Sequence, residues 1–228
     1  MKELIKRIPV IGPVARSVYL RWIRPAKPFH GSEDYWITRY RDGGNSGAGS
    51  YNRLAEFKAD VLNEFVASQD IRDVIEFGCG DGNQLTLARY PSYLGLDVSP
   101  DAVERCSRRF AGDASKSFML VQDYAGQTAQ LAISLDVIYH LTEDEVYEMY
   151  MQTLFGAARE YVVIYSSDVD ESNPQSPHVR HHQFSQWVRA HAPGWRLLRH
   201  IPNRYPYTGD NNTGSLADFY IYGRGSVT

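Results

Sequence analysis

Residues 74–83 have the sequence Val74-Ile-Glu-Phe-Gly-Cys-Gly-Asp-Gly-Asn83, which is the strongest indication of the fold in this chain. Its first four residues predict a short buried strand, and three alternating glycines, Gly78, Gly80 and Gly82, follow at once. Glycine allows the backbone to turn sharply and a ligand to approach it closely. A helix is predicted to restart at Gln84, where free amide groups can donate to a polar or anionic ligand. The stretch therefore predicts a strand, a tight turn and a helix arranged around a ligand.

Apolar and β-branched runs predict seven strands in all. They cover Val74–Phe77, Tyr93–Val98, Phe118–Val121, Leu131–Ile138, Tyr161–Ser166, Arg196–Ile201 and Ala217–Tyr222. Periodicity and end signals predict helices over Tyr51–Ala67, Gln84–Arg89, Pro100–Phe110, Thr142–Phe155 and Phe184–His191. Strands that alternate with helices in this way predict an α/β fold with a Rossmann-like, doubly wound and mostly parallel sheet. The ligand crevice of such a sheet lies at the carboxyl ends of the strands.

Several helices carry more specific signals. Ser99 is expected to cap the helix that has Pro100 in its first turn. Thr142, with Glu145 three residues later, has the spacing of a capping box. The first helix of the series has an apolar face made of Leu54, Phe57, Val61, Leu62 and Phe65. These signals predict amphipathic helices that cover the sheet.

The composition is that of a globular chain. The 228 residues suffice for one α/β domain with an extension, and 43% hydrophobic and 22% charged residues exclude a disordered or collagen-like chain. No apolar run approaches the ~18 residues of a membrane span, and Arg16 interrupts what would be the core of a secretion signal. Cys79 and Cys106 are the only cysteines and favour a reducing compartment. We therefore expect a cytoplasmic protein.

The charge is distributed unevenly. Residues 1–28 hold seven basic side chains and one acidic one, whereas the remaining 200 residues hold 17 basic and 26 acidic ones. An acidic body argues against general nucleic-acid binding, because that affinity comes from neutralising phosphates. In the basic arm, Val14, Val18 and Trp22 fall on one face of a predicted helix. Such a helix fits either an anionic membrane surface or packing against protein.

The Gly/Ser-rich stretch 43–50 is the clearest break in periodicity. We therefore expect two parts. Residues 1–50 form the basic arm, which is a helical extension, and a segment rich in aromatic residues and glycine. We call this second segment, which begins at Tyr35, the lid-like segment. Residues 51–228 form the ligand-binding domain.

Asp97 ends the second strand, nineteen residues after Gly78, where a carboxylate can accept hydrogen bonds from ribose hydroxyls. A dinucleotide-binding turn would need its third glycine at position 83, which is Asn83. Glu76, two residues before the first glycine, would repel a diphosphate but suits a cationic ligand. A tight turn without a ligand is the remaining alternative.

Residues 76–82 resemble motif I of class I S-adenosylmethionine-dependent methyltransferases, which is E/D-x-G-x-G-x-G. The resemblance covers about residues 51–224. It implies that the strand around Asp218–Tyr222 is antiparallel, and that the cofactor is S-adenosylmethionine. The implied cofactor-binding residues are Glu76, Gly78, Cys79, Gly80, Asn83, Gln84, Asp97, Val98, Asp123 and Tyr124, and from the lid-like segment Tyr35 and Arg41. Of these, Asp123 and Tyr124 take the position at which the family contacts adenine.

Residues 135–141 resemble the motif IV region of the same family, which faces the methyl group to be transferred. A hydroxyl acceptor requires a base within hydrogen-bond reach, and His140 is the best candidate. Asp136 could orient that imidazole, bind substrate or line the cofactor cleft. A purely structural role of His140, in packing or helix capping, is the alternative.

Two segments outside the nucleotide-binding core suit a polyhydroxylated acceptor. The lid-like segment ends at Tyr51, and its glycines would allow it to close. The second segment follows the fifth strand and contributes polar and aromatic side chains at the crevice, namely His178, Arg180, His181, His182 and Trp187. A metal site among these histidines is not expected, because no carboxylate joins them at a matching spacing.

The whole pattern resembles bacterial methyltransferases associated with polysaccharide biosynthesis. This resemblance implies an O-methyltransferase that acts on a sugar hydroxyl of a surface glycan or of its lipid-linked precursor. A basic arm that contacts the inner face of the membrane would fit such an acceptor. The alternatives are a methyltransferase for a small natural product or an amine, and a non-catalytic nucleotide-binding scaffold for a glycosyltransferase.

Overall fold

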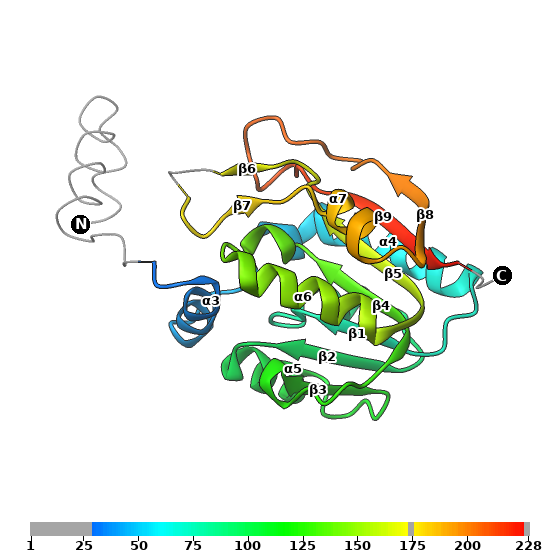
Figure 1. Ribbon diagram of the computed structural model, residues 1–228. Helices are drawn as coiled ribbons and strands as arrows, with labels where there is room; N and C mark the ends of the chain where they lie inside the picture. The colour runs from blue at the N-terminus through cyan, green and yellow to red at the C-terminus, as the bar shows by residue number, and fades with distance from the viewer. Residues whose placement is uncertain (1–28, 173–175, 226–228) are drawn as a thin grey trace. The chain divides into compact units, whose positions relative to one another are not determined.

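A computed structural model describes residues 29–172 and 176–225 (Figure 1). From Gly31 onward the chain forms one compact unit, so residues 31–50 belong to the same unit as the residues that follow. The predicted amphipathic helix of the arm lies outside the described residues, and its membrane contact stays a prediction. Among the described helices, none is both long enough and apolar enough to cross a bilayer.

The elements follow the expected alternation. The helices are α3 (Ser32–Arg41), α4 (Asn52–Ser68), α5 (Pro100–Arg109), α6 (Asp144–Ala157) and α7 (Phe184–His191). Short 3₁₀ turns are η2 (Ala48–Ser50), η3 (Gln84–Leu87), η4 (Val121–Asp123) and η5 (Ile138–His140). The main sheet contains β1 (Val74–Phe77), β2 (Tyr93–Asp97), β3 (Lys116–Leu120), β4 (Ala129–Leu135), β5 (Ala158–Ser166), β8 (Trp195–Ile201) and β9 (Asp218–Arg224). A separate two-stranded hairpin pairs β6 (Glu171–Ser172) with β7 (Arg180–His181).

The seven strands lie in the order β3-β2-β1-β4-β5-β9-β8. The first five are parallel, and β9 is antiparallel to both β5 and β8. This confirms the predicted doubly wound sheet with an antiparallel last strand. The chain order reverses between β1 and β4, so the carboxyl ends of these two central strands flank the crevice expected of such a sheet.

Both faces of the sheet are covered. Alternate residues of β1 contribute to two different clusters: Val74 packs with residues of α4, and Ile75 with residues of α6 and α7. This division follows from the pleat, because successive side chains of a strand point to opposite faces. The apolar face predicted for α4 is buried as expected. Lys58 lies on the same face and is fully buried, which the site described below explains.

Four local predictions were wrong or incomplete. The predicted helix at 84–89 is only a 3₁₀ turn, because Ala88 is already extended towards β2. The capping box is absent: α6 begins at Asp144, so Thr142 lies outside the helix, and no side chain caps it. The strand predicted to reach Ile138 ends at Leu135. Finally, the lid-like segment begins with a full helix, α3, which periodicity did not predict.

Candidate active site

The glycine turn is fixed to the end of β2. The amides of Gly78 and Cys79 both donate to the carbonyl of Leu96, at 2.7 and 2.9 Å. Gly80 has a φ of 59°, and its amide donates to Asp97 Oδ2 at 2.9 Å. A Cβ at Gly80 would lie 2.3 Å from Ser46 Oγ, so no larger residue fits there. The turn thus needs glycine at this position for its conformation and for its close neighbour.

Asp97 is buried at the carboxyl end of β2. Its two carboxylate oxygens accept from the amides of Gly80 and Ser99, each at 2.9 Å. Burial raises the pKa of Asp97 to about 6, although these hydrogen bonds oppose the change. Asp97 therefore joins the glycine turn to the start of α5.

Glu76 lies below the same turn, on the face of β1 that α4 covers. It is buried, and the hydroxyl of Tyr93 donates to its Oε2 at 2.5 Å. Burial raises the pKa of Glu76 to about 7, while the Tyr93 hydrogen bond and the charge of Lys58 act in the opposite direction. Two buried acidic groups, Glu76 and Asp97, therefore flank the turn, and a cationic ligand would favour their ionised forms.

The lid-like segment lies directly on the glycine turn. The amide of Asp81 donates to Ser46 Oγ at 2.9 Å, and the amide of Ser46 donates to Asp81 Oδ2 at 3.0 Å. The hydroxyl of Tyr51 donates to the same oxygen at 2.8 Å, and Tyr40 Oη lies 2.9 Å from Ser46 Oγ. We call these four residues, Tyr40, Ser46, Tyr51 and Asp81, the clasp.

Three further contacts hold the segment at its ends. Glu143, at the start of α6, accepts from both the amide and the hydroxyl of Ser32, at 2.8 and 2.7 Å. Arg105 of α5 donates to the carbonyl of Gly44 at 2.6 Å and to that of Tyr40. The side-chain amide of Asn83 donates to the carbonyl of Ser50 at 2.7 Å. The segment is therefore tied to both flanks of the crevice, and it covers the turn at Gly80.

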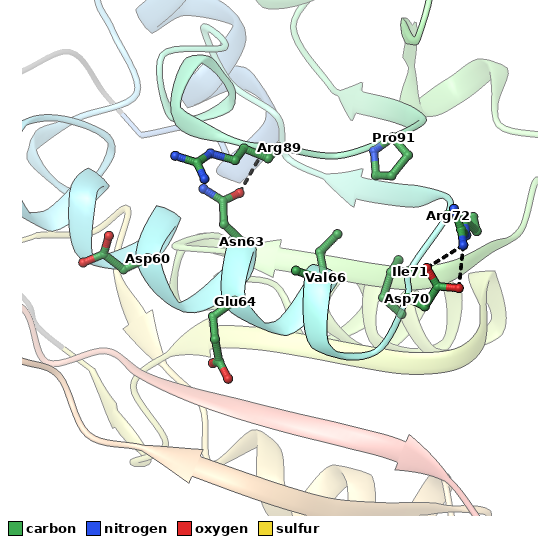
Figure 2. Close-up of a pocket in the computed structure, with 10 residues that line it drawn as sticks. Asp60, Asn63, Glu64, Val66, Asp70, Ile71, Arg72, Arg89 and Pro91 are labelled. Atoms are coloured by element: carbon green, nitrogen blue, oxygen red, sulfur yellow. Dashed lines mark hydrogen bonds and ion pairs between the residues drawn. The ribbon is translucent and has the colours of Figure 1, made fainter.

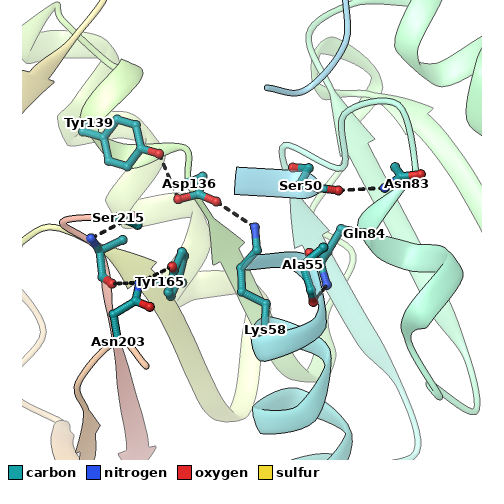
Figure 3. A network of polar contacts seen from close by, with 11 residues as sticks. Ser50, Ala55, Lys58, Asn83, Gln84, Asp136, Tyr139, Tyr165, Asn203 and Ser215 are labelled. Carbon is teal, nitrogen blue, oxygen red and sulfur yellow. Dashed lines mark hydrogen bonds and ion pairs between the residues drawn. The ribbon is translucent and has the colours of Figure 1, made fainter. Parts of the chain in front are cut away.

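A buried ion pair lies at the end of β4 (Figure 3). Lys58 Nζ donates to Asp136 Oδ2 at 2.7 Å, with side chains only 1% and 12% exposed. The hydroxyl of Tyr139 donates to Asp136 Oδ1 at 2.8 Å. Asp136 has a φ of 59°, an uncommon conformation for a residue other than glycine. Strain of this kind persists only where the surroundings enforce it, and here the Lys58 ion pair and the Tyr139 hydrogen bond do so.

His140 lies four residues after Asp136, and a backbone carbonyl, not a carboxylate, holds its imidazole. Its Nδ1 lies 3.0 Å from the carbonyl oxygen of His178. A carbonyl only accepts, so the neutral ring carries its proton on Nδ1 and a lone pair on Nε2. Burial lowers the pKa of His140 to about 4. The prediction that Asp136 might orient this imidazole was wrong, because Asp136 binds Lys58 and Tyr139 instead.

Aromatic rings surround His140. The Trp36 ring meets it edge-on at 4.9 Å between centroids, and the Tyr139 ring lies at 4.6 Å. The His178 ring is nearly parallel to the His140 ring, with 5.8 Å between centroids, and the Tyr35 ring stacks on His178 at 4.4 Å. We call Tyr35, Trp36, Tyr139 and His178 the aromatic wall. α3 therefore brings two rings to the candidate base.

The second predicted substrate segment is only partly placed at the site. The ring of His181 lies 5.8 Å from Tyr139, and its Nδ1 bonds to Ser167. Arg180 is paired with Asp144 at 2.7 Å. His182 and Trp187 are buried in packing instead: His182 stacks on Tyr147 and bonds to the Leu141 carbonyl, while Trp187 packs on Phe155. These last two are not brought to the crevice.

The remaining predicted cofactor residues are spread around the turn. Gln84 is buried and donates to the Ala55 carbonyl at 3.1 Å, while its Oε1 has no partner among the described residues. Val98 is half-buried beside Asp97, Asp123 is exposed, and Tyr124 packs edge-on against Phe77. Cys79 is buried inside the turn. Arg41 is 61% exposed beside Asp42, so it does not reach the turn.

Some residues of the site escaped the sequence analysis. Ser46 and Asp81 lie 35 residues apart and meet only in the folded chain. Lys58 did leave a signal, since it interrupts the apolar face of its helix between Phe57 and Val61. Asn203, in the β8–β9 connection, donates to Tyr165 Oη at 2.6 Å (Figure 3). Through Tyr165 it joins the polar network around the Lys58–Asp136 ion pair. Nothing in the local sequence indicated that contact.

A hollow of about 490 Å³ lies elsewhere, beside α4 and the segments leading into β1 and β2 (Figure 2). Ile71 and Pro91, which line it, precede those strands, so it lies at their amino ends, away from the glycine turn. Four of its charged residues are paired: Arg72 with Asp70, Glu64 with Arg199 and Asp60 with Arg204. It is therefore not part of the site.

The seven-stranded sheet, the glycine turn and the acid at the end of β2 define a nucleotide-binding α/β protein of the methyltransferase class. A family model described as a methyltransferase domain matches residues 51–208, more than half of the chain. The chain belongs to this family. No curated protein sequence gives a significant match.

Solved structures show the same fold at low sequence identity. The N-methyltransferase NodS from Bradyrhizobium japonicum, in complex with S-adenosyl-L-homocysteine, matches with a TM-score of 0.66 and 13% identity over 85% of this chain and 98% of that chain. Magnesium protoporphyrin IX methyltransferase from Synechocystis PCC 6803, with bound S-adenosylmethionine, matches with a TM-score of 0.57 and 17% identity over 93% of this chain and 96% of that chain. The methyltransferase domain of a bacterial Hen1 matches with a TM-score of 0.59 and 20% identity over 76% of this chain and 100% of that chain.

S-adenosylmethionine is the cofactor of this protein, and the site fits it. Glycine is required at position 80, because a Cβ there would lie 2.3 Å from Ser46 Oγ. The buried carboxyl groups of Glu76 and Asp97 suit a ligand that carries an ammonium, a sulfonium and ribose hydroxyls. An acid at position 76 would not suit a diphosphate.

Proposed function

We propose that this protein transfers a methyl group from S-adenosylmethionine to a sugar hydroxyl of a bacterial surface glycan or of its lipid-linked precursor. The observation that carries the proposal is the state of His140. The imidazole is neutral, oriented by the His178 carbonyl, and placed just after β4 with Nε2 as its basic atom. A hydroxyl acceptor is the kind that requires such a base.

Each group of residues has a role in this proposal. Glu76, Gly80 and Asp97 hold the cofactor, with Asn83 and Asp123 beside them. When bound, the cofactor supplies an electrophilic methyl group. Tyr40 and Ser46 of the clasp cover the turn and exclude water from it.

His140 takes the proton of the acceptor hydroxyl at Nε2 as the acceptor oxygen begins to bond to carbon. Nδ1–H stays on the His178 carbonyl, so the ring keeps its orientation during the transfer. The low pKa keeps the base in its accepting form at neutral pH, but it also makes Nε2 a weak base. Proton transfer is therefore expected to accompany bond formation rather than precede it.

The aromatic wall supports a sugar acceptor, because flat apolar faces with polar edges suit the faces of sugar rings. The Ser167–His181 pair adds hydroxyl and imidazole groups nearby. The basic arm would bring the site to anionic lipid at the inner face of the membrane, where a lipid-linked acceptor is found.

A small natural product or an amine is the second candidate. The aromatic wall would also stack on a planar acceptor, and NodS is named as an N-methyltransferase. An amine that is unprotonated at working pH needs no base. The effect of replacing His140 therefore separates the two candidates.

The test follows methyl transfer directly. Purified full-length protein and labelled S-adenosylmethionine are incubated with a lipid-linked glycan extract from cells that lack this gene. Label is expected in the lipid fraction, and none with Gly80→Asp, whose side chain collides with Ser46. His140→Gln should lower turnover by about 10²-fold or more. Cofactor binding without label on the glycan would contradict the glycan proposal, and a loss below about tenfold would remove His140 as the base.

A further inference from the structure

Arg39 is a partly buried cation of α3 whose bonding partners are all neutral. Its Nε donates to the Asn45 carbonyl at 2.6 Å, and its terminal nitrogens donate to Tyr35 Oη at 3.2 Å and to Asn45 Oδ1 at 3.5 Å. The guanidinium also lies over the Trp36 ring, 5.5 Å from its centroid. Within the described ranges, no carboxylate lies within ion-pair distance of Arg39. Two of its five N–H groups have no acceptor among the residues that the structure describes.

The other cations near the aromatic wall are already neutralised. Lys58 is paired with Asp136, and Arg180 with Asp144, both at 2.7 Å. Arg41 lies on the exposed side of α3, beside Asp42. Arg105 of α5 also has only carbonyl partners, but its guanidinium lies over Tyr40, which is not part of the aromatic wall. Arg39 is therefore a cation at the aromatic wall that lacks a counter-ion among the described residues.

Arg39 belongs to the acceptor side of the site. Trp36 contacts both Arg39 and His140, and Tyr35 contacts both Arg39 and His178. The positive charge of Arg39 reinforces burial in lowering the pKa of both histidines, which therefore stay neutral beside it. Arg39 thus places a positive charge beside the aromatic wall, and an anionic ligand would balance that charge.

We propose that Arg39 binds an anionic group of the methyl acceptor, so that the acceptor is an acidic sugar bearing a carboxylate or a phosphate. This inference rests on the proposed glycan methylation. A guanidinium with two free N–H groups suits both anions, because each can accept two parallel hydrogen bonds. The stacked Trp36 and the bond to Asn45 hold the guanidinium in place, which reduces the entropy lost on binding.

The carboxylate of the methyl donor itself is the competing source of an anion. The experiment therefore uses full-length protein saturated with S-adenosyl-L-homocysteine, which already carries that carboxylate. Methyl β-D-glucuronide, methyl phosphate and uncharged methyl β-D-glucoside are titrated, and binding is followed by calorimetry and by histidine NMR. We expect the two anions to bind and to compete with each other, and the glucoside to bind at least about tenfold more weakly.

Arg39→Gln should weaken anion binding about tenfold or more and change the affinity for S-adenosyl-L-homocysteine less than about twofold. Arg39→Lys should retain part of the anion affinity, and Arg41→Gln is the matched control that should retain all of it. A large loss of S-adenosyl-L-homocysteine affinity in Arg39→Gln would assign this arginine to the methyl donor and overturn the proposal. Equal binding of glucoside and glucuronide would overturn it as well.

A second readout needs no variant. A bound anion would offset the charge of Arg39 and raise the pKa of His140 and His178 in the wild-type protein, whereas the glucoside would not. If neither pKa changes when methyl phosphate is saturating, the anion binds elsewhere and the proposal fails. Anion binding that depends on Arg39, without methylation of any glycan, would leave this site standing and contradict only the proposed function. If Arg39→Gln methylates the glycan at an unchanged rate and KM, the proposed function stands and the anion site at Arg39 is contradicted.

Discussion

Glu76 and Asp97 are carboxyl groups whose pKa values burial raises towards neutral pH. The pKa of Glu76 is raised from 4.5 to about 7, and that of Asp97 from 3.8 to about 6. Between the ordinary and the raised values, the unfolded chain has released a proton that the folded chain still holds. Each group therefore makes the folded state less stable as pH rises through this interval. This cost is expected of a site adapted to a cationic ligand.

Glu76→Gln is predicted to remove its share of that pH dependence. In the wild type, the Glu76 contribution should lower the free energy of unfolding by about 2–3 kcal/mol between pH 5 and pH 8, since one pKa unit corresponds to about 1.4 kcal/mol. The neutral amide can still accept from Tyr93, so the variant should lose this decline while binding the cofactor more weakly. Urea unfolding at both pH values measures the effect. A decline of unchanged size in the variant would show that Glu76 is ionised in the folded protein.

The clasp connects two elements that are far apart in sequence, the lid-like segment and the glycine turn. Asp81 is its centre, because one carboxylate oxygen accepts from both the Ser46 amide and the Tyr51 hydroxyl, and the other accepts from the Asn83 amide at 3.0 Å. Hydrogen bonds to a charged acceptor contribute about 1.5–3 kcal/mol each. Opening the segment therefore requires several of them to break together.

Asp81→Asn is predicted to loosen the segment without unfolding the sheet. The amide has one accepting atom in place of two, so the Ser46 or the Asn83 contact must be lost. Hydrogen exchange at residues 42–50 should become at least about tenfold faster, and affinity for S-adenosylmethionine should fall. Exchange in β1 and β4 should not change. Asp34→Asn, at an exposed position of α3, is the control. Equal exchange rates at 42–50 in both variants would mean that the clasp does not hold the segment closed.

At the scale of the whole compact unit, the Lys58–Asp136 pair joins α4 on one face of the sheet to the end of β4. The network continues through Tyr165, whose ring lies 5.2 Å from Lys58 Nζ, to Asn203 in the β8–β9 connection (Figure 3). The turn that carries Asp136 also leads to His140. The pair therefore couples overall stability to the position of the candidate base.

Lys58→Met is predicted to lower the free energy of unfolding by about 3–5 kcal/mol, because it leaves the Asp136 carboxylate buried without its counter-charge. The double variant Lys58→Met/Asp136→Asn should recover most of this loss, since it buries no unpaired charge. Urea unfolding at neutral pH measures both. A loss below about 1 kcal/mol in the single variant would contradict a buried ion pair.

Much of the architecture was predictable from local pattern. Period-two and period-3.6 hydrophobicity placed β1, α4 and α7 within a residue or two, and Ser99 caps α5 as predicted, with Ala102 as the donor. The errors occurred where tertiary contacts override local preference. Thr142 lost its capping role because α6 begins at Asp144, and α3 has too weak an apolar periodicity to be recognised before its partners are known.

The α/β class, the glycine turn, the acid at the end of β2 and therefore the cofactor could all be predicted from local sequence. These features depend on residues close together in the chain, whose spacing directly sets backbone conformation and burial. Three contacts became visible only in the folded chain: the His178 carbonyl orients His140, Lys58 neutralises Asp136, and Ser46 covers Gly80. Those pairs are separated by 34 to 78 residues. Their contact follows from strand order and crossover geometry, which no local pattern encodes.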